Sequence, residues 1–578
     1  MRTGAVLVPV AVLALSFTAP PAQAAQQTTR ISVSSAGVQA NNHSQTPMIS
    51  ADGSRVVFVS TATNLVAGGS TGFSTQVYVH DRLSGNVQRA SVSSSGAIAD
   101  ANCSAPSISA TGRYVVFTSK ALNLAQPVAS SPFAFDNVFL RDLSSGTTTL
   151  VSVAASGGAA NSASVDASVS SDGRFVAFIS YATNLVAPTG PNTIGVYLRD
   201  MLAGTTTRVS VPTNPMFPDA NAMSLYASIS DSGDWVVFSS HASNLIPGDV
   251  NGREDVFLYS RLSGTLTGVT VNPPSFVGNG SSFDPRISDT GDFVIFTSSA
   301  TNLTPGDFSV NDDVFVWERA TNTFKRASEP LGGGGTSFGS GEGAVSSDGV
   351  FATFYSYASN LVPGDSNVTD DVFRKNLVTG AVERLSVSSN GQQSLQGSYS
   401  PSSSSDGRFV TFSSLAATLV AGDTNAASDI FVHGPPCSDQ TIYCTAKINS
   451  NGCVPRICST GRASISNTNQ LRITAQQVLN LKSGLFVWGT APQAAPFFGG
   501  TLCVGAPLVR TQPQSSGGTP NTNDCTGSFQ FDFTSSYIAT SGLALGTHVY
   551  GQWWYRDPFL PIRTRVGLSN AVEFLIEP

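Results

Sequence analysis

Oxygen-bearing side chains recur at one fixed spacing, D-x-[NS]-x-x-x-D, in four loops of the chain. The four sets are Asp249, Asn251 and Asp255; Asp307, Ser309 and Asp313; Asp365, Asn367 and Asp371; and Asp423, Asn425 and Asp429. Oxygen atoms at alternate loop positions suit calcium, which takes about six to eight of them. Asp and Asn also close turns by bonding to their own backbone, and this interpretation is favoured because the loops lack further acidic ligands. No cofactor is expected, and calcium in these loops is the less favoured alternative.

Aromatic side chains form a second group with binding potential. Long segments such as VPTNPMFPDANAMSLYA, NPPSFVGNGSSFD and EPLGGGGTSFGSGEG separate short apolar runs. The candidate ligand-binding residues in or beside such segments are Phe217, Tyr226, Phe276, Phe283, Phe338 and Tyr399. Long loops on a rigid scaffold commonly carry binding sites, so we expect these aromatics to be exposed. The alternative is that the loops pack on one another as spacers.

A third aromatic group, Trp553, Trp554 and Tyr555, lies near the C-terminus beside Arg556 and Asp557. Aromatic faces bind the apolar surfaces of sugars, and charged tips fix hydroxyl groups. Alternate residues of a strand point to opposite faces, so packing of at least one tryptophan in a core is favoured over sugar binding.

Single sequence motifs of hydrolases occur, but without the partner residues that catalysis needs. GTSFG, residues 335–339, satisfies G-x-S-x-G, but no helical pattern surrounds it as a nucleophile elbow requires. The histidines give no triad or metal pairing; they are His43, His80, His241, His433 and His548. We therefore predict no catalytic residues and a protein that is not an enzyme. Two carboxylates from distant loops are the route by which a glycoside hydrolase would arise.

The cysteines mark a separate C-terminal region. Six of the seven fall in the last 142 residues: Cys437, Cys444, Cys453, Cys458, Cys503 and Cys525. Three disulfides are favoured over a zinc site, because paired C-x-x-C spacing and nearby histidines are missing. Their connectivity cannot be read from the sequence. Cys103 is expected to be a partly buried thiol in a loop.

A turn of the type SSDGRFVAF recurs seven times before this region. Its glycines, 58 to 61 residues apart, are Gly53, Gly112, Gly173, Gly233, Gly291, Gly349 and Gly407. A period this regular indicates a repeat architecture, and each period contains four short apolar runs bounded by turn residues. The sequence therefore predicts an all-β chain with a seven-bladed β-propeller.

The ends of the repeat predict how the propeller closes. The seventh repeat stops at Gly434 without its fourth strand, and the run RISVS from Arg30 has the sequence of that strand. We expect the N-terminal strand to complete the last blade and to leave no unpaired edge. Strand direction alternates, so tight turns share one face and all long loops share the other. The long-loop face is the predicted binding surface.

The runs SSDGRFVAF, VYLRD and TTTRVSV resemble the PD40/WD40-like repeats of TolB-type β-propellers over the range 30–434. The repeats here are longer than those of that family, and no TolB-like N-terminal domain precedes them, so the partners of TolB are not carried over. PFFGGTLCVG together with GQWWYRDP resembles a C-terminal module of unknown function on exported bacterial proteins. The alternating runs around them predict a disulfide-stapled β-sandwich-like domain.

The N-terminus has the pattern of a signal peptide. Met1 and Arg2 precede an apolar stretch, residues 5–17, and APPAQA ends in small residues at Ala24. A membrane anchor is the weaker alternative, because a span needs ~20 apolar residues. No other apolar run is long enough to span a membrane. The expected division is a signal peptide at 1–24, the propeller at 25–434 and the C-terminal module at 435–578.

The formal net charge is −7, and the 30 Lys and Arg residues are dispersed. No basic stripe is present to neutralise a run of phosphates, so nucleic acid is not an expected partner. The sequence favours an exported, periplasmic or extracellular, non-enzymatic binding or scaffold protein. Its ligand would be a protein or another component of the cell envelope, recognised by the long-loop face. The alternative is a secreted carbohydrate-binding or carbohydrate-active protein.

Overall fold

A computed structural model describes residues 27–577 of the 578. The ranges left out are 69–73, 126–134, 187–193, 273–275, 310, 331, 435–440, 445, 448, 452–454, 461, 466–470, 518–526 and 562–563. The expected signal peptide and the cysteines Cys437, Cys453 and Cys525 lie outside the described residues. In the part of the chain that the structure describes, no helix is long and apolar enough to cross a membrane.

The expectation of an all-β chain is confirmed. Four-stranded antiparallel sheets follow one another along the chain, and we number them sheets 1 to 7. Their strands are β2 (Ser44–Ile49), β3 (Arg55–Ser60), β4 (Gln76–Asp81) and β5 (Val87–Arg89) in sheet 1; β6 (Cys103–Ile108), β7 (Tyr114–Ser119), β8 (Asn137–Asp142) and β9 (Thr147–Leu150) in sheet 2; β10 (Ser164–Val169), β11 (Phe175–Ser180), β12 (Gly195–Asp200) and β13 (Thr205–Arg208) in sheet 3; β14 (Ser224–Ile229), β15 (Trp235–Ser240), β16 (Asp255–Ser260) and β17 (Thr265–Gly268) in sheet 4; β20 (Ser282–Ile287), β21 (Phe293–Ser298), β22 (Asp313–Glu318) and β23 (Thr323–Arg326) in sheet 5; β24 (Ser340–Val345), β25 (Phe351–Ser356), β26 (Asp371–Asn376) and β27 (Val382–Arg384) in sheet 6; and β28 (Ser398–Ser403), β29 (Val410–Ser414), β30 (Asp429–Gly434) and β1 (Gln27–Arg30) in sheet 7.

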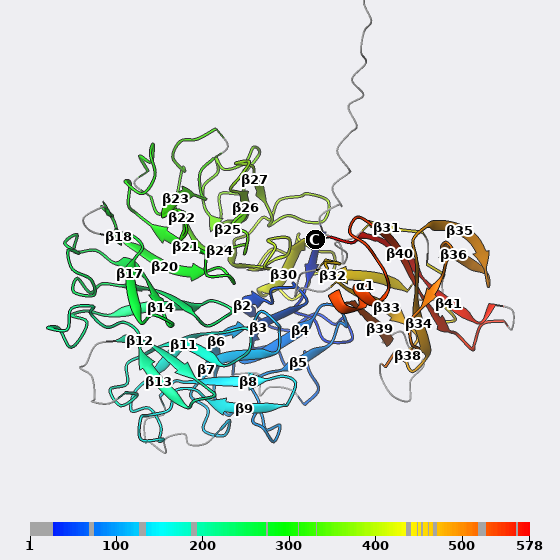
Figure 1. Ribbon diagram of the computed structural model, residues 1–578, viewed down its shortest axis with the longest axis horizontal. Helices are drawn as coiled ribbons and strands as arrows, with labels where there is room; N and C mark the ends of the chain where they lie inside the picture. The colour runs from blue at the N-terminus through cyan, green and yellow to red at the C-terminus, as the bar shows by residue number, and fades with distance from the viewer. Residues whose placement is uncertain are drawn as a thin grey trace, which may run out of the picture.

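The sheets form a ring (Figure 1). The first strand of every sheet contacts the first strands of both neighbours, and β2 of sheet 1 contacts β28 of sheet 7. β1 pairs antiparallel with β30, with Arg30 opposite Phe431, and so supplies the fourth strand of sheet 7. This is the pairing that the ends of the repeat predict. The short hairpin β18 (Val271–Asn272) and β19 (Phe276–Val277) follows sheet 4 and has no counterpart strands after the other sheets described.

The second and third strands of each sheet carry the core. Their apolar residues are buried at successive positions, because neighbouring sheets cover both faces. Each sheet contains one stacked pair of aromatic rings on these two strands, with centroids 5.8 to 6.0 Å apart. Such cross-strand pairs add stability beyond the burial of their area.

The repeated glycines have two physical reasons. Gly349 has φ +67°, which side chains rarely adopt, and a Cβ there would lie 2.3 Å from the ring of Phe293 in the preceding sheet. Gly53 has φ +70°, and its Cβ would lie 2.5 Å from the ring of Phe409. Because Phe409 belongs to sheet 7 and Gly53 to sheet 1, the same contact closes the ring.

Residues 441–577 form a second unit of packed sheets, which lies to one side of the ring in Figure 1. Residues of both larger sheets share one core, which includes Ile473, Phe486, Phe529 and Trp553. The elements are β31 (Thr441–Tyr443), β41 (Val566–Leu575), β40 (His548–Arg556), β34 (Ser483–Gly489), β37 (Val509–Arg510) and β38 (Gln514–Ser515) in one sheet; β32 (Arg456–Thr460), β33 (Leu471–Val478) and β39 (Gly527–Phe533) in another; the hairpin β35 (Pro492–Phe497) and β36 (Gly500–Val504); and the helix α1 (Ser535–Thr540).

One disulfide, Cys444–Cys503, lies within the described part of this unit, and Cys458 is also disulfide-bonded. Cys103 differs from its expectation. It begins β6 instead of lying in a loop, it is fully buried, and burial raises the pKa of its thiol to about 11. An apolar environment disfavours the thiolate, so this residue is a core side chain.

Candidate functional site: the central channel

The first strands of the seven sheets line a central cavity of about 280 Å³. Each of these strands is interrupted by an irregularity of register, and one residue in each has a positive φ between +34° and +55°. The seven residues are Thr46, Ala105, Asp166, Tyr226, Asp284, Glu342 and Ser400. All seven line the cavity. Left-handed backbone at residues other than glycine is strained, and a β-bulge of this kind re-aims a side chain.

The cavity is acidic. Asp166, Asp284 and Glu342 line it, and Arg286 is the one Lys or Arg among its described lining residues. Burial raises the pKa of Asp166. Burial also raises the pKa of Asp284 to about 6, with smaller contributions from Glu342 and other carboxylates, while Arg286 opposes the shift. The raised pKa values arise because negative groups lie close together and are partly removed from water.

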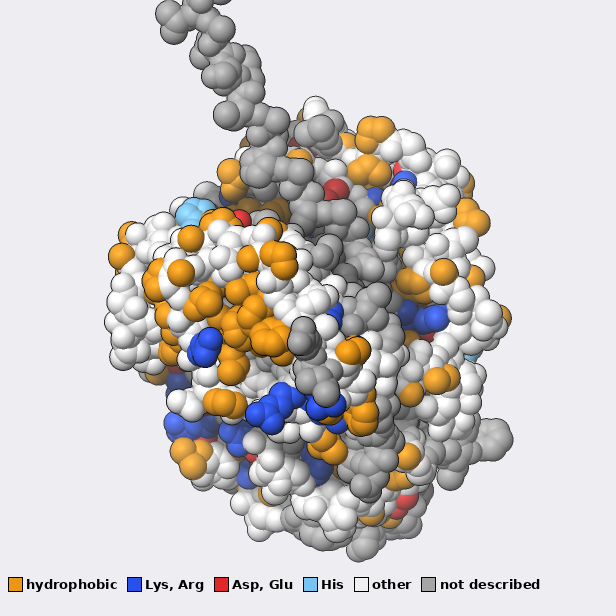
Figure 2. All heavy atoms as spheres, turned by 90° about the vertical axis from the view of Figure 1, so that its right-hand side faces the viewer, with side chains coloured by type: hydrophobic (Ala, Val, Ile, Leu, Met, Phe, Trp, Pro, Cys, Tyr) orange, Lys and Arg blue, Asp and Glu red, His pale blue; other side chains and the backbone are white. Residues whose placement is uncertain are grey.

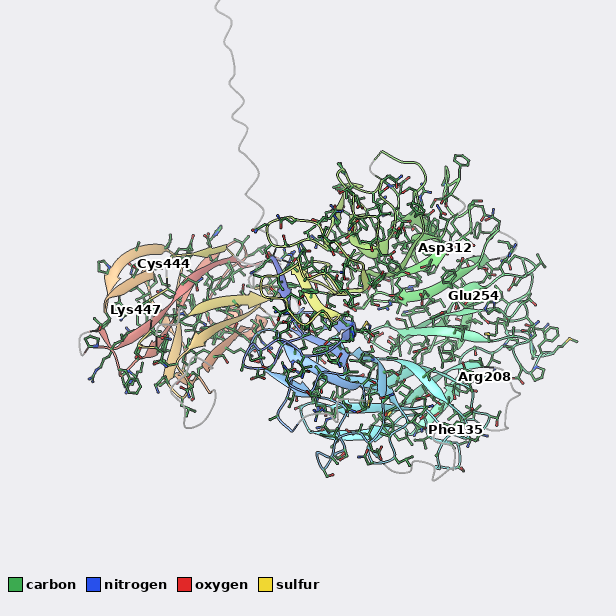
Figure 3. The ribbon with its side chains drawn as sticks, turned by 180° about the vertical axis from the view of Figure 1, so that it is seen from behind. Phe135, Arg208, Glu254, Asp312, Cys444 and Lys447 are labelled. Carbon is green, nitrogen blue, oxygen red and sulfur yellow. A yellow bond between two sulfur atoms is a disulfide. The ribbon has the colours of Figure 1, made fainter. Side chains whose placement is uncertain are left out.

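Further carboxylates precede the third strands of sheets 4 to 6, at the end of the channel that the long loops surround. They are Glu254, Asp312 and Asp370; Figure 3 labels the first two on neighbouring sheets. Glu254 accepts a 2.6 Å hydrogen bond from the Ser239 hydroxyl and lies 3.4 Å from Nε2 of His241. Burial raises the pKa of both Asp312 and Asp370.

Tyrosines complete this end of the channel. Tyr226 lies at a bulge, and its phenol is within electrostatic reach of Asp284 and Glu254. Burial and nearby carboxylates raise the pKa of Tyr355 to about 12. Its ring meets that of Tyr399 edge-on at 6.0 Å. A second hollow of about 290 Å³ lies beside Tyr399 and shares two lining residues with the central cavity.

The opposite end of the channel is formed by the tight turns between the first and second strands. Backbone hydrogen bonds join the tight turns of neighbouring sheets around it, from Ala51 to Ala110, Ser171 to Asp231, Asp231 to Asp289, Ser347 to Ser405 and Ser405 to Ala51, at 2.8 to 3.1 Å. Burial and the neighbouring Asp289 raise the pKa of the Asp231 carboxyl to about 8. These bonds tie the tight turns of neighbouring sheets together.

The predicted loop aromatics separate into three groups. Phe217 is 48% exposed and Phe338 51% exposed, as expected of a surface. Tyr226 and Tyr399 lie in the channel and at its edge, on first strands and not on loops. Phe283 is half-buried on β20.

Phe276 requires a correction, because it is not an exposed loop residue. Its ring lies 5.7 Å from that of Phe324 and packs against the core shared by sheets 4 and 5. The hairpin β18–β19 folds this segment back onto the sheets, which a loop composition rich in Gly, Pro and Asn did not indicate.

Three of the four carboxylate loops are occupied by an arginine from the last strand of the same sheet. Nη1 of this arginine lies 2.7 Å from Oδ1 of the first Asp in sheet 5, 3.0 Å in sheet 6 and 3.5 Å in sheet 7. The pairs are Asp307 with Arg326, Asp365 with Arg384, and Asp423 with Arg30. The second Asp of each loop, Asp313, Asp371 or Asp429, is also within 4 Å of that arginine.

These loops were expected to be turns or calcium sites, and the arginine was missed. It stands 13 positions after the second Asp in sheets 5 and 6, so the sequence did carry a signal. Nδ2 of Asn367 and of Asn425 donates to the second Asp of its own loop, at 2.8 and 3.2 Å. Among the described residues, no group of three or more His, Cys, Asp and Glu side chains is arranged to hold a metal ion.

The C-terminal aromatic group packs as the alternation of a strand predicts. Trp553 is fully buried, with its ring 5.1 Å from that of Phe529, and Tyr555 is also in the core. Trp554 points to the other face, 4.7 Å from the ring of Phe497 and 5.6 Å from the guanidinium of Arg510. Figure 2 shows hydrophobic side chains gathered on this unit, with Lys and Arg side chains along one border.

No protein-family model and no curated protein matches the chain. Solved structures that resemble it include a putative TolB from Agrobacterium tumefaciens, 16% identical with a TM-score of 0.31, covering 49% of this chain and 79% of that one. The β-propeller domain of the Trilobed protease from Pyrococcus furiosus is 10% identical with a TM-score of 0.42, covering 68% and 95%. An acylaminoacyl peptidase from Pyrococcus horikoshii is 10% identical with a TM-score of 0.41, covering 75% and 57%.

TolB, which the repeats resemble in sequence, is thus found again among the structures. The comparison contradicts one expectation, namely that the chain is not an enzyme, because peptidases stand among the matches. That expectation is withdrawn.

Proposed function

We propose that the seven sheets are the blades of one closed propeller that binds a positively charged segment of a protein ligand in the mouth of its channel. The observation that carries the proposal is the group Asp166, Asp284 and Glu342, held by strained bulges in a cavity where Arg286 is the one Lys or Arg among the described lining residues. Strained backbone maintained at equivalent positions of all seven sheets is typical of a functional site.

The chemistry of the mouth favours a cation. Carboxylates in a partly desolvated cavity attract an ammonium or guanidinium group more strongly than carboxylates in water. Tyr226, Tyr355 and Tyr399 add ring faces and hydroxyl groups, which bind cations and hydrogen-bond donors. A cavity of about 280 Å³ accepts a side chain or a peptide terminus but not a folded domain.

Export is part of the proposal. The disulfide Cys444–Cys503 is typical of an oxidising compartment, and the first 24 residues have the pattern of a signal peptide. The ligand would then be a protein of the periplasm, the cell envelope or the exterior.

The test is a binding screen on the intact mature chain. Fluorescent peptides rich in lysine, acidic peptides, neutral peptides and a glycan panel are compared by anisotropy at low and high salt. We expect lysine peptides to bind and to weaken with salt. Asp284→Asn and Glu342→Gln are expected to weaken binding about tenfold.

Asn tolerates the left-handed backbone of position 284, so that variant is expected to fold. Glu318→Gln, at the tight-turn end of β22, is the matched control and is expected to bind normally. Equal binding of acidic and lysine peptides would contradict the proposal. Retention of glycans alone would support the carbohydrate alternative instead.

A further inference from the structure

The seven sheets provide seven versions of one buried position, at the start of the third strand. In sheets 5, 6 and 7 this position is Asp, and an arginine on the last strand neutralises it. Arg326 and Arg384 stand opposite the third strand's phenylalanine, and Arg30 stands opposite Phe431. The first Asp of each loop contacts the same Nη1 through its Oδ1 atom.

Sheet 3 keeps a charge pair at this position although the residues change places. Gly195 replaces the Asp, and a Cβ on it would lie 2.8 Å from Nε of Arg208, so the arginine fills the space. Asp219, from a different segment, then lies 2.6 Å from Nη1 of Arg208. Sheet 2 has neither charge, with Asn137 and Leu150 at the two positions.

Sheet 4 keeps both carboxylates but lacks the arginine. Gly268 stands opposite Phe257 where the arginine would be. A Cβ on Gly268 would lie 1.7 Å from the carbonyl oxygen of Val271, because the chain folds back there into the β18–β19 hairpin. No side chain fits at this position, so the cation is missing for a reason of backbone geometry.

The carboxylates of sheet 4 are nevertheless buried. Asp255 is 0% exposed; its Oδ1 accepts a 2.7 Å hydrogen bond from Thr270 and its Oδ2 one of 2.7 Å from Asn251. Asp249 is 7% exposed, and its Oδ1 is buried without a hydrogen-bond partner. This is the atom that meets the arginine in sheets 5 to 7. The charged groups that act on Asp255 are Asp249 and Glu254, both acidic.

Two buried carboxylates without a counter-charge are costly, and a positive group beside them would remove that cost. We propose that a metal cation, calcium, occupies in sheet 4 the place that the arginine guanidinium occupies in sheets 5, 6 and 7. Oδ1 of Asp249 and Oδ2 of Asp255 are the anionic ligands.

The Asn251 amide positions this pair and is not itself a ligand. Its Nδ2 donates to Oδ2 of Asp255 at 2.7 Å and to the carbonyl oxygen of Gly278 at 3.2 Å, and its Oδ1 accepts from the backbone N–H of Arg253 at 2.9 Å. Water completes the shell from the surface, where the neighbouring Val250 is 83% exposed. Hard oxygen ligands of this kind select calcium over zinc or copper.

The experiment uses the intact mature chain, freed of metal with chelator and titrated with calcium by calorimetry and by thermal melting. We expect one saturable site and a rise in melting temperature. Asp249→Asn is expected to weaken calcium binding about 100-fold or more, because it removes a direct ligand. Asp365→Asn, the matched change in sheet 6, is expected to lower the melting temperature and to leave calcium binding unchanged.

Failure to fold does not obscure the result, because the Asp249→Asn variant is checked by circular dichroism before titration. Absence of calcium binding to the native chain would overturn the proposal. So would unchanged binding in Asp249→Asn. A third result would also overturn it: calcium has no effect on the native chain, and Asp255→Asn raises its melting temperature. The pair would then hold a proton instead of a cation.

Discussion

The two ends of the channel are built from the same seven strands but in opposite ways. At the tight-turn end, glycines pack against rings of the next sheet and backbone hydrogen bonds join neighbouring turns. At the long-loop end, strained bulges present carboxylates and tyrosines to a cavity that stays open. The tight turns hold the ring together, whereas the bulges give up local stability to position polar groups.

The largest expected effect is on the tight-turn end. Gly349→Ala places a Cβ 2.3 Å from the Phe293 ring at φ +67°, so we expect the free energy of unfolding to fall by roughly 3 kcal/mol. Gly364→Ala is the control, with φ +77° but no atom within 4 Å, and is expected to cost about 1 kcal/mol. Urea denaturation measures both. Equal losses would show that the contact between sheets adds nothing.

A second pair of variants compares the stability contribution of a packed loop aromatic with that of an exposed one. Phe276→Ser removes a ring that packs on Phe324, and we expect a loss of roughly 2 kcal/mol. Phe338→Ser removes an exposed ring that touches Tyr357 edge-on at 5.0 Å, and a loss of about 1 kcal/mol or less is expected. Thermal melting of both variants checks this order, and the reverse order would place Phe276 on the surface.

At the long-loop end, the affinity for a lysine peptide is expected to depend on pH. The pKa of Asp284 is raised to about 6, so its carboxyl is largely protonated at pH 5 and largely ionised at pH 7. Binding of a lysine peptide is therefore expected to strengthen between pH 5 and pH 7. Asp284→Asn is expected to remove most of this dependence and to bind about tenfold more weakly at pH 7. An unchanged pH profile in the variant would exclude Asp284 from the site.

At the tight-turn end, the Asp231 carboxyl is expected to make stability, and not binding, depend on pH. The pKa of Asp231 is raised to about 8 in the fold, above its ordinary value, so its contribution to stability is full below about pH 4. That contribution is lost as the pH rises through 8. Asp231→Asn is expected to flatten the decline in the free energy of unfolding between pH 5 and pH 8, with Glu318→Gln as control. A variant that declines as steeply as the parent would contradict the assignment.

The tight-turn end was largely predictable from the sequence, whereas the channel was not. The spacing of the repeated glycines indicates four-stranded units, and the run at Arg30 indicates the closing strand, because both are local patterns that recur. The bulge position holds six different residue types in the seven sheets, from Ala105 to Glu342, so no motif marks it. Only the closure of the ring brings residues some 60 positions apart, such as Asp284 and Glu342, into one cavity.

The arginine partners are an intermediate case. Arg326 and Arg384 follow their aspartates at a constant distance, and sheet 4 breaks the pattern at Gly268, which a comparison of the repeats could have found. What the sequence did not contain was the direction of the side chains. Phe276 and Tyr226 were grouped together as loop aromatics, although one packs in a core and the other lines the channel.

Site-specific photo-crosslinking tests most directly whether the peptide binds in the channel or on the loops. A benzophenone-bearing phenylalanine replaces Tyr226 in the channel or, in a separate protein, Phe338 on the exposed loops, and each is irradiated with a bound lysine peptide. We expect a crosslink from position 226 that excess unlabelled peptide and high salt remove, and little or none from position 338. A crosslink from position 338 with none from position 226 would place the binding site on the loops and contradict binding in the channel.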